Sequence, residues 1–325
     1  MRKLVGATLL AAIVLAPAQT VLAHGGNGGS TSDYRIEVTG FEGDASGIEV
    51  HPVELGNRME LVRTTAQEVQ ILGYSGEPYL RLDSTGTFEN TNSPAHYINL
   101  DRFARQPVPE SASATAEPNW VRIGDGTSIR WHDHRTHWMD PTPRQDVRDN
   151  PGVERLISTD SVALIVDGRP VGAVVTVTWV PPPSRTTWLV ISSLAACALL
   201  AALVLVPRLR RSVPALTAVA SIAIVVGSGP SAFRIAAGAI ALVIAIGGWL
   251  TKRSWLSAAS GLVTVVFAVT HFEVFEHHYL AGWAPASLQR VAITVALAMG
   301  AAIGGSQLVI GLGATQPNEP VMADA

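Results

Sequence analysis

The chain has almost no cysteine. Its single cysteine, Cys197, lies in the apolar C-terminal half, so the residues before it contain none. A disulfide needs two cysteines and forms in oxidising compartments such as the cell envelope. A domain built from the N-terminal half must therefore be held together by its hydrophobic core, and about 150 residues are enough for one.

The motifs of several common enzyme classes are also missing. The sequence has no Gly-x-Ser-x-Gly, no Gly-rich phosphate-binding loop and no His-Glu-x-x-His. The N-terminal half has no basic tract, and the net charge is −3, which argues against nucleic acid as a partner. We therefore expect a protein that is neither an enzyme nor a nucleic-acid binder.

The first residues are typical of a secretory signal peptide. Arg2 and Lys3 are followed by an apolar run and by the cleavage pattern Val-Leu-Ala that ends at Ala23. Cleavage after Ala23 makes His24 the first residue of the mature protein, and cleavage after Ala18 is the alternative. Residues 1–23 are thus predicted to be a signal peptide and residues 24–33 a Gly-rich mature N-terminus.

The composition changes at Pro183, after which charged residues become rare. Residues 183–186 read as a linker, residues 187–312 as a membrane domain and residues 313–325 as a cytoplasmic tail. Basic residues at 208–211 and 252–253 are expected on the cytoplasmic side, which agrees with an exported N-terminal domain. The lipid bilayer is therefore a predicted partner. Five spans of about 17 to 22 residues are predicted: Thr187–Val206, Val213–Gly229, Ala232–Leu250, Ser254–Thr270 and Val291–Leu312.

Residues 34–182 show short runs in which apolar and polar residues alternate. Such runs at spacings of 8 to 12 residues are typical of an antiparallel β-sandwich, here of an immunoglobulin-like or cupredoxin-like kind. The clearest hairpin joins Ser161–Val166 to Val171–Trp179 through a turn at Asp167-Gly168. The predicted fold is an all-β extracytoplasmic domain followed by an α-helical membrane domain.

The segment from Trp131 to Met139 contains three histidines, and imidazole is the commonest protein metal ligand. On a strand, His132 and His134 lie on one face with their Cα atoms about 6.5–7 Å apart, close enough to share an ion. His137 has the wrong parity and joins them only if the chain turns nearby. In the alternative interpretation, Asp133 and neighbouring polar residues pair with one another, the tryptophans pack on the core, and no metal binds.

Two other places offer metal ligands. An N-terminal His24 presents its amine and Nδ1 to one ion, which is the chelate of a copper-binding histidine brace; alternatively, the tail is simply unfixed. His271 and His278 are expected on one face of a helix at the outer end of the fourth span, on the same side as the exported domain. They are candidate ligands or proton carriers, or else part of a wet, aromatic-rich helix end.

The motifs Gly73-Tyr-Ser-Gly-Glu-Pro-Tyr-Leu80, Asn92-Ser-Pro-Ala-His-Tyr97 and Trp131-His-Asp-His-Arg-x-His-Trp-Met139 resemble those of a family of exported, membrane-anchored bacterial proteins without an established activity. The layout, with an N-terminal His24, is also loosely similar to periplasmic copper-handling proteins of the CopC/CopD and YcnI types. That resemblance implies a copper-binding β-sandwich at the cell envelope.

The leading hypothesis is therefore a membrane-anchored extracytoplasmic protein that handles or senses copper, with His132, His134 and His137 as main ligands. One alternative is an envelope scaffold that binds a protein partner and no metal, in which the three histidines point apart. The other is a copper enzyme that uses a histidine brace.

Overall fold

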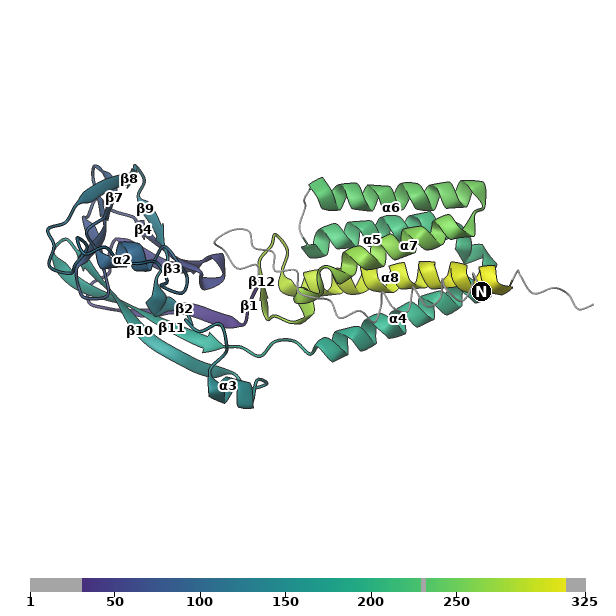
Figure 1. The fold of residues 1–325 in the computed structure, drawn as a ribbon, viewed down its shortest axis with the longest axis horizontal. Coiled ribbons are helices and arrows are strands. Elements are labelled where there is room, and N and C mark those ends of the chain that lie inside the picture. The colour runs from purple at the N-terminus through teal and green to yellow at the C-terminus, as the bar shows by residue number, and fades with distance from the viewer. Residues whose placement is uncertain (1–30, 229–231, 314–325) are drawn as a thin grey trace, which may run out of the picture.

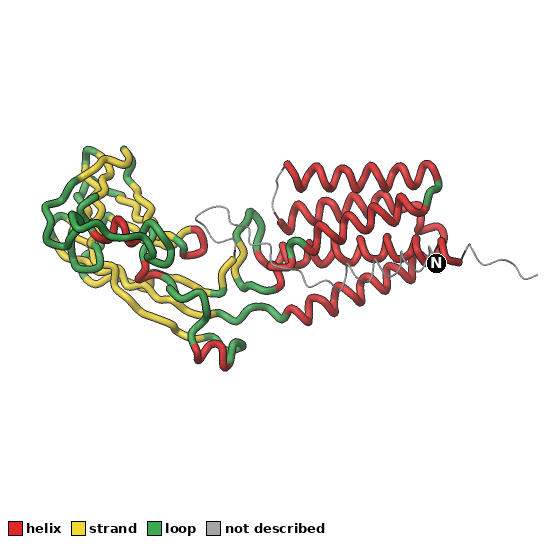
Figure 2. The backbone as a smooth tube through the Cα atoms, in the orientation of Figure 1, coloured by secondary structure: helices red, strands yellow, loops and turns green. Residues whose placement is uncertain are grey.

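The computed structural model describes residues 31–228 and 232–313, which form an elongated molecule with a β domain at one end and a helical bundle at the other (Figures 1 and 2). The predicted signal peptide, His24 and the C-terminal residues 314–325 lie outside the described residues. Within the described part, the predicted order of an antiparallel β domain followed by helices is confirmed.

The β domain consists of two antiparallel sheets. The larger has the strand order β2-β11-β10-β5-β6-β7-β8 and the smaller the order β3-β4-β9. The strands of the larger sheet are β2 (Tyr34–Glu42), β5 (Val69–Leu72), β6 (Pro78–Asp83), β7 (Gly86–Asn90), β8 (Trp120–Gly124), β10 (Arg155–Val166) and β11 (Arg169–Trp179). Those of the smaller are β3 (Ile48–Val53), β4 (Arg58–Arg63) and β9 (Ser128–Trp131), and the domain also has short helices η1 (Glu54–Gly56), α2 (Pro94–Ile98), η2 (His134–Thr136) and α3 (Gln145–Asp149).

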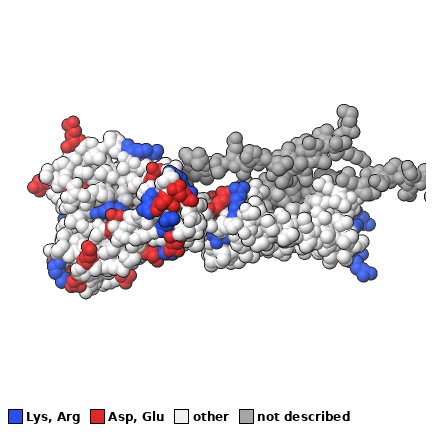
Figure 3. All heavy atoms as spheres, turned by 90° about the horizontal axis from the view of Figure 1, so that it is seen from below, with Lys and Arg blue, Asp and Glu red and all other residues white. Residues whose placement is uncertain are grey.

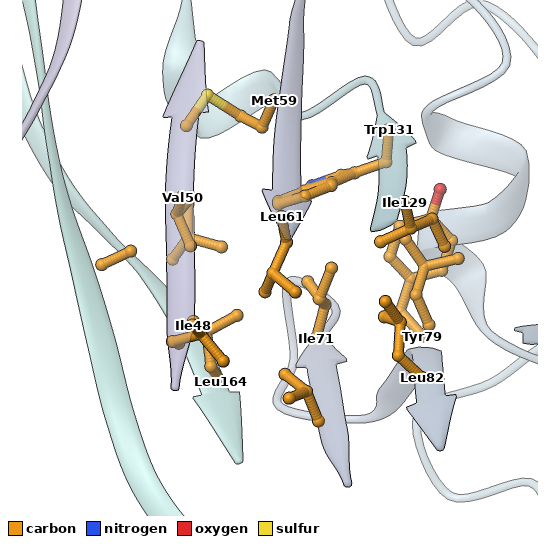
Figure 4. Packing of buried hydrophobic residues seen from close by; sticks show 14 of the residues in the cluster. Ile48, Val50, Met59, Leu61, Ile71, Tyr79, Leu82, Ile129, Trp131 and Leu164 are labelled. Carbon is orange, nitrogen blue, oxygen red and sulfur yellow. The ribbon is translucent and has the colours of Figure 1, made fainter. Parts of the chain in front are cut away.

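The core lies between these sheets, as the alternation of apolar residues predicts. In β4, every second side chain is buried, and Met59 and Leu61 are fully enclosed. They meet Ile71, Leu82 and Trp131 from other strands (Figure 4). The predicted hairpin is β10–β11, and its turn residues Asp167 and Gly168 both have positive φ, the conformation that Asp-Gly favours.

Five helices run side by side in the bundle (Figure 1): α4 (Arg185–Leu205), α5 (Val213–Ser228), α6 (Ala232–Thr251), α7 (Ser254–Val269) and α8 (Ala286–Gly313). Three stretches are long and apolar enough to cross a membrane: Arg185–Leu205, Pro207–Ser228 and Ala286–Ile310. The prediction of five spans is therefore too high by this measure. The apolar parts of the other two helices, Ile235–Thr251 and Ser254–Val269, are shorter. The 16 residues of α7 rise by only about 24 Å, against a hydrocarbon core of about 30 Å.

The bundle has the surface expected of helices in contact with lipid. Large apolar side chains point outward along it, among them Leu194, Phe233 and Val243, each at least two-thirds exposed. On the face seen in Figure 3, the bundle is uncharged between the junction with the β domain and basic residues at its far end. Two linkers lie at that far end (Figure 1): the one between α4 and α5, which contains η3 (Pro207–Ser212), and the one between α6 and α7. The two basic clusters at 208–211 and 252–253 thus share one end, as the topology argument requires.

A two-stranded ribbon joins the β domain to the bundle. Strand β1 (Thr31–Ser32) pairs with β12 (Tyr279–Leu280), which lies between α7 and α8 beyond the short helix η4 (Phe272–Phe275). The segment after the fourth apolar run was predicted to lie on the same side as the N-terminal domain, and in the structure the two are in contact through this ribbon (Figure 1).

Candidate metal centre

The histidine motif begins at the end of a buried strand. Strand β9 stops at Trp131, whose ring is buried in the core opposite Met59. The chain then forms the single turn η2, and the Asp133 side chain caps this turn by accepting a hydrogen bond from the Arg135 N–H. This is the turn that His137 needs in order to join His132 and His134 on one side.

The three imidazoles converge. The ring centroids are 4.9 Å apart for His132 and His134, 4.5 Å for His132 and His137, and 5.4 Å for His134 and His137. One ring nitrogen from each lies within 4.8 Å of the others, and this is the one group of three or more metal-binding side chains among residues 31–228 and 232–313. Three imidazole nitrogens this close together could hold a metal ion.

A backbone carbonyl from a different segment orients each ring. His132 Nδ1 lies 2.7 Å from the Asn57 carbonyl oxygen, His134 Nε2 lies 3.0 Å from that of Asp101, and His137 Nδ1 lies 3.0 Å from that of Asp133. A nitrogen that faces a carbonyl oxygen carries the proton, so the other nitrogen of His132 and of His134 keeps a lone pair for a metal. His132 Nε2 fits this assignment, because it is buried and has no hydrogen-bond partner. In His137 the Nε2 atom also lies 3.5 Å from the Arg102 carbonyl oxygen, and the shorter contact, at Nδ1, is the one to which we assign the proton.

The carboxylate of Asp133 holds the turn in place. It is fully buried and accepts hydrogen bonds from Trp131 Nε1 at 3.0 Å and from the Arg135 guanidinium at 2.7 Å and 2.9 Å. Burial by itself raises the pKa of Asp133, but the hydrogen bonds and charge of Arg135 outweigh it and the net shift is downward. Asp133 thus pairs with a polar neighbour, as the metal-free interpretation expected, and this pairing fixes the backbone between His132 and His137.

The histidines of the cluster are held neutral. Burial lowers the pKa of His132 and of His134, and it lowers the pKa of His137 to about 3, with the nearby His132 and Arg102 adding to the effect. Metal ions bind the neutral form of imidazole. Few protons therefore compete with a metal at this site near neutral pH.

The cluster borders a large cavity. Its volume is about 860 Å³, and its wall includes His132, His137, Tyr34, Arg102 and the strand β1. Cavities of this size hold small molecules. A metal between the three rings would lie at one end of a space large enough for a further ligand.

The second predicted cluster has a different arrangement. Helix α7 ends at Val269, so His271 and His278 do not share a helix face, and neither belongs to the converging group. His271 Nδ1 bonds the Phe267 carbonyl at 2.8 Å, and His278 Nδ1 lies 3.1 Å from the Pro181 carbonyl oxygen. His277 Nδ1 bonds the Asp33 carboxylate at 2.8 Å. These residues form the joint between the domain and the bundle.

Comparison with known proteins gives no relative: no family model, curated protein or solved structure matches the chain. A function can therefore be inferred only from the site itself. Sequence reasoning named the three histidines that converge but missed Arg102, a lone arginine in an irregular loop, and the carbonyl groups of Asn57 and Asp101, which leave no mark in a sequence.

Proposed function

We propose that this protein is a membrane-anchored metal-binding protein of the cell envelope that takes up copper through His132, His134 and His137. The observation that carries the proposal is the convergence of three neutral imidazoles, each oriented by its own carbonyl group. Such second-shell hydrogen bonds fix ring orientation and raise the basicity of the metal-binding nitrogen.

Copper is favoured by the chemistry of the ligands. All three are imidazole nitrogens, and among divalent ions Cu(II) binds nitrogen sites most tightly. Zinc also accepts three histidines and is the main competitor. The envelope location comes from the predicted signal peptide and from the basic clusters, which lie at the end of the bundle away from the β domain.

We further propose that all five helices of the bundle lie in the membrane. Three are long and apolar enough to cross it alone. Helices α6 and α7 pack alongside them and have exposed apolar residues such as Val243 and Val266. A short helix is accommodated when the bilayer thins or when its neighbours cover it, at modest cost.

The convergence of the rings runs against the scaffold hypothesis, which required the three histidines to point apart. The histidine brace rests on His24, which lies outside the described residues, and His137 supplies the third nitrogen without it. Binding rather than catalysis therefore remains the simpler role.

The test is a titration of the full-length protein in detergent with Cu(II), and separately with Zn(II), beside a His132→Ala/His134→Ala variant. We expect one copper per chain and an affinity loss of more than about 100-fold in the variant, because losing second-shell partners alone costs 10- to 100-fold. Electron paramagnetic resonance of the copper-loaded protein should show coupling to three nitrogens.

The matched control is His271→Ala/His278→Ala, which also removes two histidines and should leave copper affinity unchanged. Equal affinities in the wild type and the His132→Ala/His134→Ala variant would refute the proposed site. Tighter binding of Zn(II) than of Cu(II) would refute the assignment of copper.

A further inference from the structure

Arg102 stands out among the charged residues of the cavity wall. Arg58, Arg105 and Arg130 also line this wall, and each pairs with a carboxylate, from Glu54, Asp101 and Glu60 respectively. Within the described ranges, Arg102 forms no such pair. Its guanidinium donates a hydrogen bond to the Asn57 side-chain oxygen at 2.9 Å, which is a neutral acceptor.

Arg102 is exposed to solvent, and its side chain lines the cavity. Desolvation lowers its pKa, although arginine stays protonated in proteins. One hydrogen bond to an amide leaves most of its five N–H donors for another partner.

Arg102 also lies next to the histidine cluster. Its charge contributes to the lowered pKa of His132 and of His137, and its carbonyl oxygen is 3.5 Å from His137 Nε2. His132 and His137 line the same cavity as the guanidinium. The cavity wall therefore has a cation that pairs with no carboxylate of the described residues, beside the place where a metal ion would add more positive charge.

We propose that the cavity binds an oxyanion, a carboxylate or phosphate group, that places one oxygen on the metal and another on Arg102. This inference rests on the proposed function, because the metal forms half of the site. Three histidines leave a coordination position open, as in metal centres that exchange a ligand. Arginine matches carboxylate and phosphate geometry with two parallel hydrogen bonds.

Such a group has two sources. It belongs either to a free anion or to a lipid headgroup, since the wall also includes Thr31 and Ser32 of β1, the strand that pairs with the bundle. The two sources present the same oxygens to the metal and to Arg102, and an experiment distinguishes them.

The test uses the full-length protein loaded with Cu(II) and titrated with inorganic phosphate, followed by the copper absorption and resonance spectra. A second arm places the protein in nanodiscs with or without phosphatidic acid. We expect a phosphate-dependent spectral shift in the first arm, and a shift in the second arm identifies the lipid as the source. In Arg102→Ala, the affinity for the anion should fall about 10- to 100-fold, as for loss of a charge-assisted hydrogen bond.

Arg105→Ala is the matched control, because Arg105 lines the same wall and is exposed like Arg102 but is paired with Asp101. It should keep the anion affinity of the wild type. Copper affinity should be unchanged or higher in Arg102→Ala, since that variant removes a positive charge but no ligand. Copper binding with no anion response, or equal anion affinity in both variants, would overturn the inference and leave the proposed function standing. Failure of the wild type to bind copper refutes the proposed function first.

Discussion

The chain has two groups of three histidines, and their side chains have different partners. The first group is His132, His134 and His137, and the second is His271, His277 and His278. His132, His134 and His137 each place a ring nitrogen against a backbone carbonyl, and one nitrogen from each ring lies within 4.8 Å of the others. His277 and His278 bond instead to two different parts of the β domain, Asp33 and Pro181. Similar histidine-rich segments therefore become a candidate metal centre in one place and a joint in the other.

The partner of each imidazole explains the difference. A carbonyl group orients a ring without adding charge, and burial then lowers the pKa, so the three histidines of the first group stay neutral. A carboxylate favours the protonated form, and the hydrogen bond from His277 to Asp33 raises the pKa of His277. Neutral imidazoles bind metals, whereas a protonated one forms an ion pair.

The largest effect on the first group of histidines is expected from removing the Asp133 carboxylate, which supports their turn. In Asp133→Ala, the Arg135 guanidinium loses its partner in the interior, and Trp131 Nε1 loses its acceptor. Breaking a buried pair costs about 3–5 kcal/mol. We expect that decrease in the unfolding free energy of the β domain, measured by urea denaturation of the full-length protein in detergent.

The control for this change is Asp125→Ala. Asp125 pairs with Arg122 but is 83% exposed, so its loss should cost less than about 1 kcal/mol. Equal losses in the two variants would mean that the buried pair does not hold the turn.

A smaller change tests whether the Asn57 carbonyl group, by orienting His132, affects the affinity for copper. Glu54, Leu55 and Gly56 all have positive φ, and this strained turn directs the Asn57 carbonyl to His132. A Cβ at Gly56 would lie 2.6 Å from Ile36 Cγ1, so Gly56→Ala must displace the turn. We expect copper affinity to fall about 10-fold, the lower end of second-shell effects.

Gly76→Ala separates this effect from backbone strain. Gly76 has almost the same φ, +81° against +82°, but its Cβ would meet nothing within 4 Å. Both variants should lose stability through strain, and only Gly56→Ala should lose copper affinity, measured by competition with a chelator. Equal affinities would show that the carbonyl of Asn57 does not tune His132.

Much of the β domain was predictable because its signals are local. The alternating runs Ile48–Val53, Met59–Arg63 and Tyr79–Leu82 agree with β3, β4 and β6 to within a residue at each end, and Asp167-Gly168 located the hairpin turn. Strand parity predicted that His132 and His134 converge, but β9 ends at Trp131 and His134 lies in η2, so the turn rather than a strand face brings the two rings together. The carbonyl groups that orient these rings could not be predicted, because Asn57 lies 75 residues from His132 and Asp101 lies 33 residues from His134.

The helical half shows where local signals fail. Apolar composition marked all five helices, and it placed the ends of α6 and α7 to within a residue, but it counted their apolar segments as spans although these are shorter than the three that are long enough to cross a bilayer. At the end of α7, the Thr270 hydroxyl and the His271 ring both bond the Phe267 carbonyl and stop the helix. The helix face expected to carry His271 and His278 therefore does not exist.

The stability of the joint between the β domain and the bundle should depend on pH, because His277 and Asp33 form an ion pair there. The folded-state pKa of His277 is raised above the ordinary value, by the hydrogen bond to Asp33 and by the charges of Asp33, Glu276 and Glu273. The guanidinium of Arg290 also faces this site, because it donates to the His277 carbonyl. A raised pKa means that the ion pair stabilises the joint fully below the ordinary value of about 6.5, and that this contribution is lost as pH rises through the folded-state pKa.

We therefore expect the amides of β1 and β12 to exchange hydrogen faster at pH 9 than at pH 6, after correction for intrinsic exchange. The change should be modest, because the His277 side chain is 37% exposed and water screens the pair. Asp33→Asn should remove the pH dependence, while the β10–β11 ladder, which contacts neither residue, reports the global stability at each pH. Protection of β1 that is constant with pH in the wild type would show that His277 contributes no charge to the joint, and the contrast between the two histidine groups would then rest on geometry alone.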